Sequence, residues 1–163
     1  MDSADFTSTE GAANITLVVR RTIHARPEEV FAAWTEPVQL KRWWGPRPVI
    51  CVDAEVDLRV GGHYRIANQF PDGTLLWISG EFEVVDPPYR LSYSWRAGSD
   101  PQHSERVTVQ FEPQGDATEV TVVHERIRNA TARDRHQAGW SGCLDGLYTY
   151  LSPARFASPR ATS

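Results

Sequence analysis

Cysteine is scarce in this chain, and long apolar runs are missing. The 163 residues include two cysteines, Cys51 and Cys143, which lie far apart and outside any CxxC pair. This spacing argues against a disulfide framework and a zinc knuckle. No apolar stretch approaches the roughly 20 residues of a membrane-spanning helix, and the polar N-terminus lacks the basic start and apolar run of a signal peptide. We therefore expect a cytoplasmic protein without a membrane span.

Basic charge also falls short of what nucleic-acid binding requires. The chain has 17 Lys and Arg against 21 Asp and Glu, a formal net charge of −4, and no run of basic residues. Domains that bind nucleic acid carry a basic patch, so we expect no such partner. Hydrophobic residues at 40% and charged residues at 23% are typical of a soluble globular protein. We expect one domain over 14–152, a disordered tail at 1–13 and a flexible tail at 153–163.

What remains has the periodicity of an α+β fold. A β-branched strand precedes two short helices that begin at Pro27 and Pro37. From residue 49 to 127, β-branched and alternating segments recur between turn signals, which predicts an antiparallel meander. Residues 131–151 place apolar side chains at helical spacing. This order predicts a curved antiparallel sheet of about six to seven strands wrapped around one long C-terminal helix.

Glycines form a stripe along the predicted C-terminal helix, at positions 139, 142 and 146. Each costs a helix about 1 kcal/mol relative to alanine. The stripe either lets another backbone approach closely or leaves room for a ligand, and the sequence does not separate these alternatives.

Two adjacent tryptophans, Trp43 and Trp44, stand before Gly45 and Pro46. We predict that Trp43 packs into the core against the first helix and that Trp44 covers the mouth of a cavity. The alternative is that both indoles belong to the core, since tryptophan is usually buried.

Several segments in order carry a family resemblance: PEEVFAAWTEPVQLKRWWGP, GEFEVVDPPYRLSYSW, HERI and GWSGCLDGLYTYL. They resemble the bacterial homologues of the activator of heat-shock-protein-90 ATPase, which belong to the START-like, helix-grip (SRPBCC) superfamily. The resemblance covers roughly residues 14–152. It implies a cavity between the concave face of the sheet and the long helix. This fold hosts lipid carriers, cyclases, hydrolases and co-chaperone domains, so it does not define one function.

The polar residues among the inward-facing positions suggest where a ligand would bind. An apolar cavity with a few placed polar groups is typical of a small-molecule site. We expect a binding protein for a small hydrophobic molecule, without a cofactor, and we predict eight contact residues: Trp44, Tyr64, Asn68, Tyr93, Trp95, His124, His136 and Trp140. The alternatives are that the tyrosines are core residues with hydroxyls at the rim, that His124 is structural, and that His136 lies on the helix surface at the cavity mouth.

Two other functions stay open at this stage. The resemblance implies a co-chaperone-like interaction module with a chaperone partner and a place in the stress response. A cyclase or hydratase-type enzyme would use His124 or a tyrosine as acid or base. We expect no metal centre, because the five histidines show no i,i+4 pair and no clustered carboxylate. The protein is expected to be a monomer or a homodimer.

Overall fold

The computed structural model describes residues 14–98 and 103–152, so the tails expected at 1–13 and 153–163 lie outside the described residues. Within that part of the chain there are seven strands and three helices. Their order is β1 (Ile15–Ile23), α2 (Pro27–Thr35), α3 (Pro37–Trp43), β2 (Ile50–Val56), β3 (His63–Gln69), β4 (Leu75–Asp86), β5 (Arg90–Ala97), β6 (Glu105–Gln114), β7 (Ala117–Ile127) and α4 (Ala130–Tyr150). No helix of the described residues is long and apolar enough to cross a membrane.

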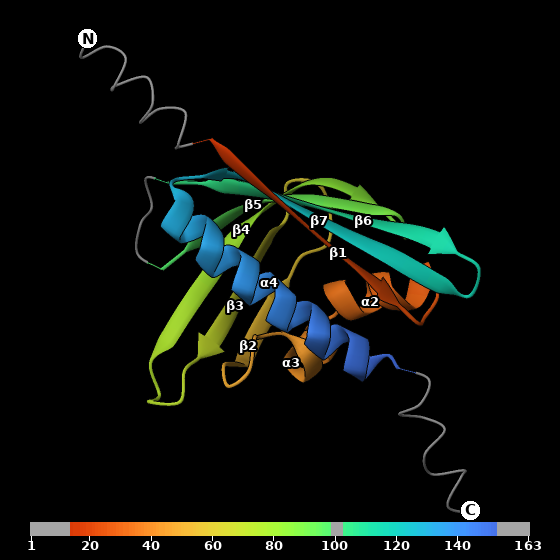
Figure 1. Ribbon diagram of the computed structural model, residues 1–163, viewed down its shortest axis with the longest axis horizontal. Coiled ribbons are helices and arrows are strands. Elements are labelled where there is room, and N and C mark those ends of the chain that lie inside the picture. The colour runs from red at the N-terminus through yellow and green to blue at the C-terminus, as the bar shows by residue number, and fades with distance from the viewer. Residues whose placement is uncertain (1–13, 99–102, 153–163) are drawn as a thin grey trace, which may run out of the picture.

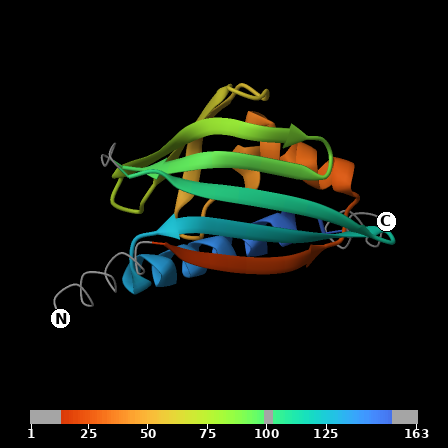
Figure 2. The same cartoon turned by 90° about the horizontal axis from the view of Figure 1, so that it is seen from above.

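The strands form one antiparallel sheet with the order β1-β7-β6-β5-β4-β3-β2. Figure 1 shows α4 crossing the face of this sheet, with α2 and α3 beside it. Seen from above, the helices lie on one side of the sheet and the strands curve in front of them (Figure 2). A curved sheet around the C-terminal helix, with two short helices after the first strand, confirms the fold predicted from the sequence.

Alternation along the strands predicts correctly most of the side chains that face the core. The prediction is wrong at one point in β4. Alternation from Phe82 predicts that Val84 faces the core. The ladder between β4 and β5 shifts between Phe82 and Val84, and Val85 then pairs with Leu91. Because a bulge adds one residue to a strand, it reverses the faces of the residues beyond it. Val85, rather than Val84, therefore packs against the core.

The glycine stripe of α4 has a structural cause at two of its three positions. A Cβ on Gly142 would lie 2.5 Å from Cβ of Pro46, and a Cβ on Gly146 would lie 2.6 Å from the carbonyl oxygen of Trp43. Around Gly139, apart from its chain neighbours and the backbone of α4 itself, no atom of the described residues lies within 4 Å of such a Cβ. Gly142 and Gly146 thus let the end of α3 and the loop after it approach the backbone of α4. Of the two alternatives for the glycine stripe, close approach of another backbone is therefore correct at Gly142 and Gly146, and room for a ligand is not needed there.

Candidate functional site: an aromatic cavity beside a buried carboxylate

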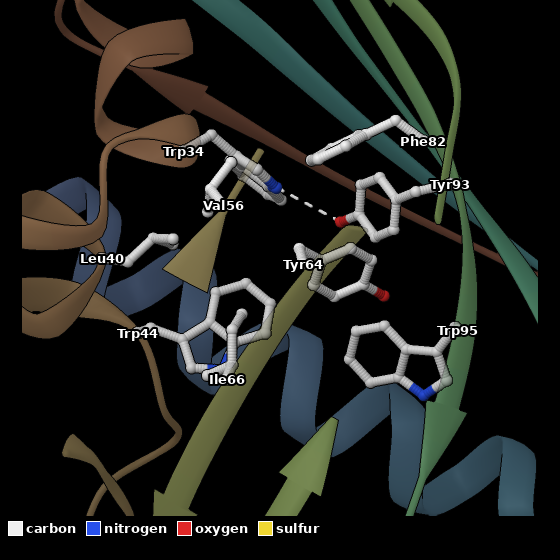
Figure 3. Close-up of a pocket in the computed structure, with 9 residues that line it drawn as sticks. All are labelled: Trp34, Leu40, Trp44, Val56, Tyr64, Ile66, Phe82, Tyr93 and Trp95. Atoms are coloured by element: carbon white, nitrogen blue, oxygen red, sulfur yellow. Dashed lines mark hydrogen bonds between the residues drawn. The ribbon is translucent and has the colours of Figure 1, made fainter. Parts of the chain in front are cut away.

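A cavity of about 20 Å³ lies between the sheet and the short helices. Nine apolar or aromatic side chains line it, and all are drawn in Figure 3. Six come from strands: Val56, Tyr64, Ile66, Phe82, Tyr93 and Trp95. The others are Trp34 of α2, Leu40 of α3 and Trp44, which directly follows α3. Because one water needs roughly 10–15 Å³, the cavity holds about one water molecule in this state.

Trp44 is a buried wall of this cavity. Its side chain is 5% exposed, and its ring centroid lies 5.3–6.4 Å from those of four other tryptophans: Trp34, Trp43, Trp95 and Trp140. The neighbouring Trp43 donates its indole N–H to the carbonyl oxygen of Ala33 in α2, at 2.9 Å. Trp43 therefore packs against the first helix, as predicted, whereas no hydrogen bond of this kind holds the indole of Trp44 in the described part of the chain.

The two tyrosine hydroxyls at the cavity are buried and bonded rather than at its rim. The Tyr93 hydroxyl accepts a hydrogen bond from Trp34 Nε1 at 3.2 Å, drawn as the dashed line in Figure 3. The Tyr64 hydroxyl donates to the carbonyl oxygen of Ser94 at 2.7 Å. Burial raises the pKa of both phenols, so both stay protonated. Neither hydroxyl is a candidate base.

Three buried side-chain polar atoms have no hydrogen-bond partner among the described residues. They are Nε1 of Trp44, Nε1 of Trp95 and Oδ1 of Asn68. Trp44 and Trp95 line the cavity, and Figure 3 shows both indole nitrogens on its same side, away from Tyr93. Asn68 lies on β3 but does not line the cavity. A buried donor or acceptor without a partner costs about 1–3 kcal/mol, so these atoms need an explanation.

A carboxylate surrounded by histidines lies behind Trp95. Oε1 of Glu105, at the start of β6, is 2.7 Å from His124 Nε2 and 3.0 Å from His136 Nε2. Oε2 of Glu105 is 3.0 Å from His103 Nε2. The rings of His124 and His136 stack with centroids 4.3 Å apart. Burial disfavours the charge of Glu105, but the hydrogen bonds from His124 and His136 outweigh it and hold the pKa of this carboxyl well below its usual range.

The protonation of His124 follows from its second hydrogen bond. Trp140 Nε1 is 3.0 Å from His124 Nδ1. Because an indole nitrogen only donates, Nδ1 must accept, and the single proton of a neutral imidazole is then on Nε2, where it is donated to Glu105. Burial lowers the pKa of His124, which keeps the ring neutral. Both ring nitrogens are thus engaged, so His124 has no free nitrogen to act on a substrate as acid or base.

The fold brings together a group that the sequence argument missed. Glu105, His124 and His136 offer ligand atoms within 4.8 Å of one another. The sequence shows no carboxylate clustered with the histidines, but the fold places Oε1 of Glu105 within 3.0 Å of both His124 and His136. A metal would need the lone pair of His124 Nε2, which carries the proton in this network. We therefore interpret the cluster as a hydrogen-bonded proton network, and the expectation of no metal stays a prediction.

The predicted site residues divide between these two places. Trp44, Tyr64, Tyr93 and Trp95 line the cavity, and His124, His136 and Trp140 belong to the Glu105 network. Asn68 belongs to neither.

Glu105 and Trp34 were not predicted as site residues. A signal for Glu105 was present, because it shares strand parity with Val107 and Val109, which face the core.

Comparison with known proteins identifies the family and agrees with the fold. The family model described as "Activator of Hsp90 ATPase homolog 1-like protein" matches residues 24–152. Protein CV1439 from Chromobacterium violaceum is 26% identical with a TM-score of 0.78, over 85% of this chain and 97% of that one. The AHSA1-like protein from Aeromonas hydrophila is 27% identical with a TM-score of 0.74, over 86% and 94%. The AHSA1 protein from Silicibacter pomeroyi, at 24% identity, shares the fold with a TM-score of 0.76, over 85% and 98%. No curated protein matches the sequence.

Proposed function

The chain belongs to the family of activator of Hsp90 ATPase homolog 1-like proteins, and from this premise we propose that it binds one small apolar molecule at the aromatic cavity. The observation that carries the proposal is the cavity itself. Its nine lining side chains are all apolar or aromatic, and two of them bury indole N–H groups that have no partner within residues 14–98 and 103–152. Apolar walls with a few placed polar groups are typical of small-molecule sites.

A ligand needs more space than about 20 Å³, so one wall must move. Six of the lining residues are held in the strands of the sheet, Trp34 is bonded to Tyr93, and Leu40 is buried within helix α3. Trp44 lies beyond the end of α3, and its side chain lacks a hydrogen bond within the described residues. Trp44 is therefore the wall that moves, which gives the predicted lid a physical basis.

The cost of opening can be bounded. Complete exposure of a tryptophan gives up about 200 Å² of burial, worth about 5 kcal/mol at 25 cal/mol per Å². Hydration of the unpartnered N–H returns about 1–3 kcal/mol of this. The ligand covers part of the remaining surface. Opening thus weakens binding by a few kcal/mol at most, and it leaves room for a molecule of about the size of an indole.

The experiment uses naphthalene as the probe and the indole N–H signals of the six tryptophans in a nitrogen-15 NMR spectrum as the readout. We expect saturable shifts of the Trp44 and Trp95 signals in the wild type. In Trp44→Ala the cost of opening is gone, so naphthalene should bind at least about tenfold more tightly, equivalent to about 1.4 kcal/mol. Trp43→Ala is the matched control, because Trp43 is equally buried but does not line the cavity, and its affinity should not rise.

Trp44→Ala loses about 3–5 kcal/mol of stability, as is usual for a buried tryptophan. Trp44→Leu is the milder second variant if the first fails to fold. Absence of saturable binding to the wild type up to the solubility of naphthalene refutes the proposed function. Equal affinity of the wild type and the folded Trp44 variant refutes the role of Trp44 as the moving wall.

A further inference from the structure

Trp95 differs from Trp44 because it is held in a strand of the sheet, so its indole N–H stays beside the cavity when Trp44 moves. Its side chain is 7% exposed and extends from β5. Its ring lies between Trp44, with centroids 6.4 Å apart, and His124, with centroids 5.2 Å apart. In Figure 3 the six-membered ring of Trp95 points into the cavity and the nitrogen lies at its lower edge. The place of Trp95 in the sheet and its ring contacts with His124 and with Trp140, whose centroid lies 5.6 Å away, remain when Trp44 moves.

Among the three indole N–H groups at the cavity, the hydrogen bonds single out that of Trp95. The Trp34 N–H is bonded to Tyr93, and the Tyr64 hydroxyl is bonded to Ser94. Of the cavity-lining residues, Trp44 and Trp95 alone bury a polar atom without a partner in the part of the chain that the structure describes. Movement of Trp44 exposes its N–H to water. The donor of Trp95 then remains, and it needs an acceptor.

The charge around the cavity decides what kind of acceptor this is. None of the nine lining side chains is charged. A carboxylate ligand would therefore be buried without a cation, which is strongly unfavourable. Moreover, Trp95 pairs in the sheet with Glu105, whose carboxylate is held in its charged form by the histidines. A negative charge at this point repels an anionic ligand. A neutral oxygen acceptor fits both observations.

We propose that the ligand is a neutral aromatic molecule of one or two rings with a carbonyl oxygen that accepts a hydrogen bond from Trp95 Nε1. This inference rests on the proposed function, because it names the class of molecule bound at that site. Aromatic rings match the faces of Trp34 and Tyr64 around the cavity and take the place that the Trp44 indole leaves. A carbonyl only accepts, so it satisfies the indole N–H without burying a second donor.

The test compares two probes with the same bicyclic skeleton, indane and 1-indanone, which differ by one carbonyl. Their dissociation constants are measured for the wild type and for Trp95→Phe, which keeps an aromatic ring and removes the N–H. The ratio of the two constants cancels the different hydrophobicity of the probes. A buried hydrogen bond is worth about 1.4 kcal/mol here, so Trp95→Phe should lower the relative preference for 1-indanone about tenfold.

Trp34→Phe is the matched control, since Trp34 lines the same cavity but its N–H is bonded to Tyr93. The relative preference for 1-indanone should not change in this variant. In the wild type, the Trp95 N–H signal should move downfield with 1-indanone and not with indane.

Each outcome has one meaning. Binding of both probes with an unchanged ratio in Trp95→Phe overturns the inference and leaves the proposed function standing. Failure of both probes to bind overturns the inference, and the proposed function falls with it only if naphthalene also fails to bind. A water molecule that stays on Trp95 Nε1 in a crystal structure with 1-indanone also overturns the inference, because the cavity then holds its partner without the ligand.

Discussion

Replacing His124 by glutamine should make the stability of this protein less sensitive to acid. His124 is fully buried, and its ring is neutral because Trp140 donates to Nδ1 while burial lowers its pKa. Glutamine offers an amide N–H to Glu105 and an amide oxygen to Trp140, but it does not titrate. His124→Gln thus keeps both hydrogen bonds of the side chain and removes its ability to take up a proton as the pH falls.

The magnitude follows from the difference between the folded and unfolded states. The pKa of His124 is lowered by folding, so the unfolded chain binds the proton more strongly. Its contribution to stability is complete above the unfolded pKa of about 6.5 and is lost as the pH falls. At pH 5, about 1.5 pH units below that pKa, protonation of the histidine stabilises the unfolded state by RT ln(1 + 10^1.5), about 2 kcal/mol. This value is the upper limit, reached if the folded protein excludes the proton throughout.

The assay is urea unfolding of the wild type and His124→Gln at pH 7.5 and pH 5. Between pH 7.5 and pH 5, the free energy of unfolding of the wild type should fall by up to about 2 kcal/mol more than that of the variant. His63→Gln is the control, because the His63 side chain is 78% exposed and its replacement should leave the pH dependence of the wild type in place. If the difference between the wild type and His124→Gln does not change with pH, the assignment of a buried neutral imidazole is wrong.

Two further predictions concern the packing of α4 and the cysteines. Gly139→Ala should stabilise the protein by about 1 kcal/mol. Gly146→Ala should destabilise it, because the new Cβ would lie 2.6 Å from the Trp43 carbonyl oxygen. Urea unfolding measures both variants, and a gain in stability at both positions would contradict the close approach of α3 to α4. Burial raises the pKa of Cys143 to about 12 and that of Cys51 to about 11, so a thiol reagent at pH 8 should modify both slowly in the native protein and quickly in urea. Rapid native labelling would show that the core opens easily.

The elements and their order could be predicted because they depend on local sequence. Pro27 and Pro37 begin the two short helices, and turn signals separate the strands of the meander. The bulge at Val84 could not be predicted, since alternation gives no sign of an added residue. Local periodicity was therefore sufficient to predict the fold. It did not predict which side chains face the core beyond the bulge in β4.

The candidate site was harder to predict because its parts meet only through tertiary packing. Parity was enough to place Tyr93 and Trp95 on the inner face, and the same parity would have included Glu105. That His124 and His136 approach one oxygen of Glu105 depends on how α4 packs on the sheet. The volume of the cavity depends on where Trp44 packs, and spacing along the chain does not determine that.

The pairing of the first strand with the last has a consequence for synthesis. β1 pairs with β7, whereas each strand from β2 to β6 pairs with the next strand along the chain. At about 5–20 residues per second, the roughly 90 residues between β1 and β7 take on the order of 5–20 s to emerge from a ribosome. During this time the β-branched segment from Ile15 to Ile23 has no native partner strand. An unpaired strand of this kind attracts other chains, so we expect nascent chains to need protection at β1 until β7 has been made.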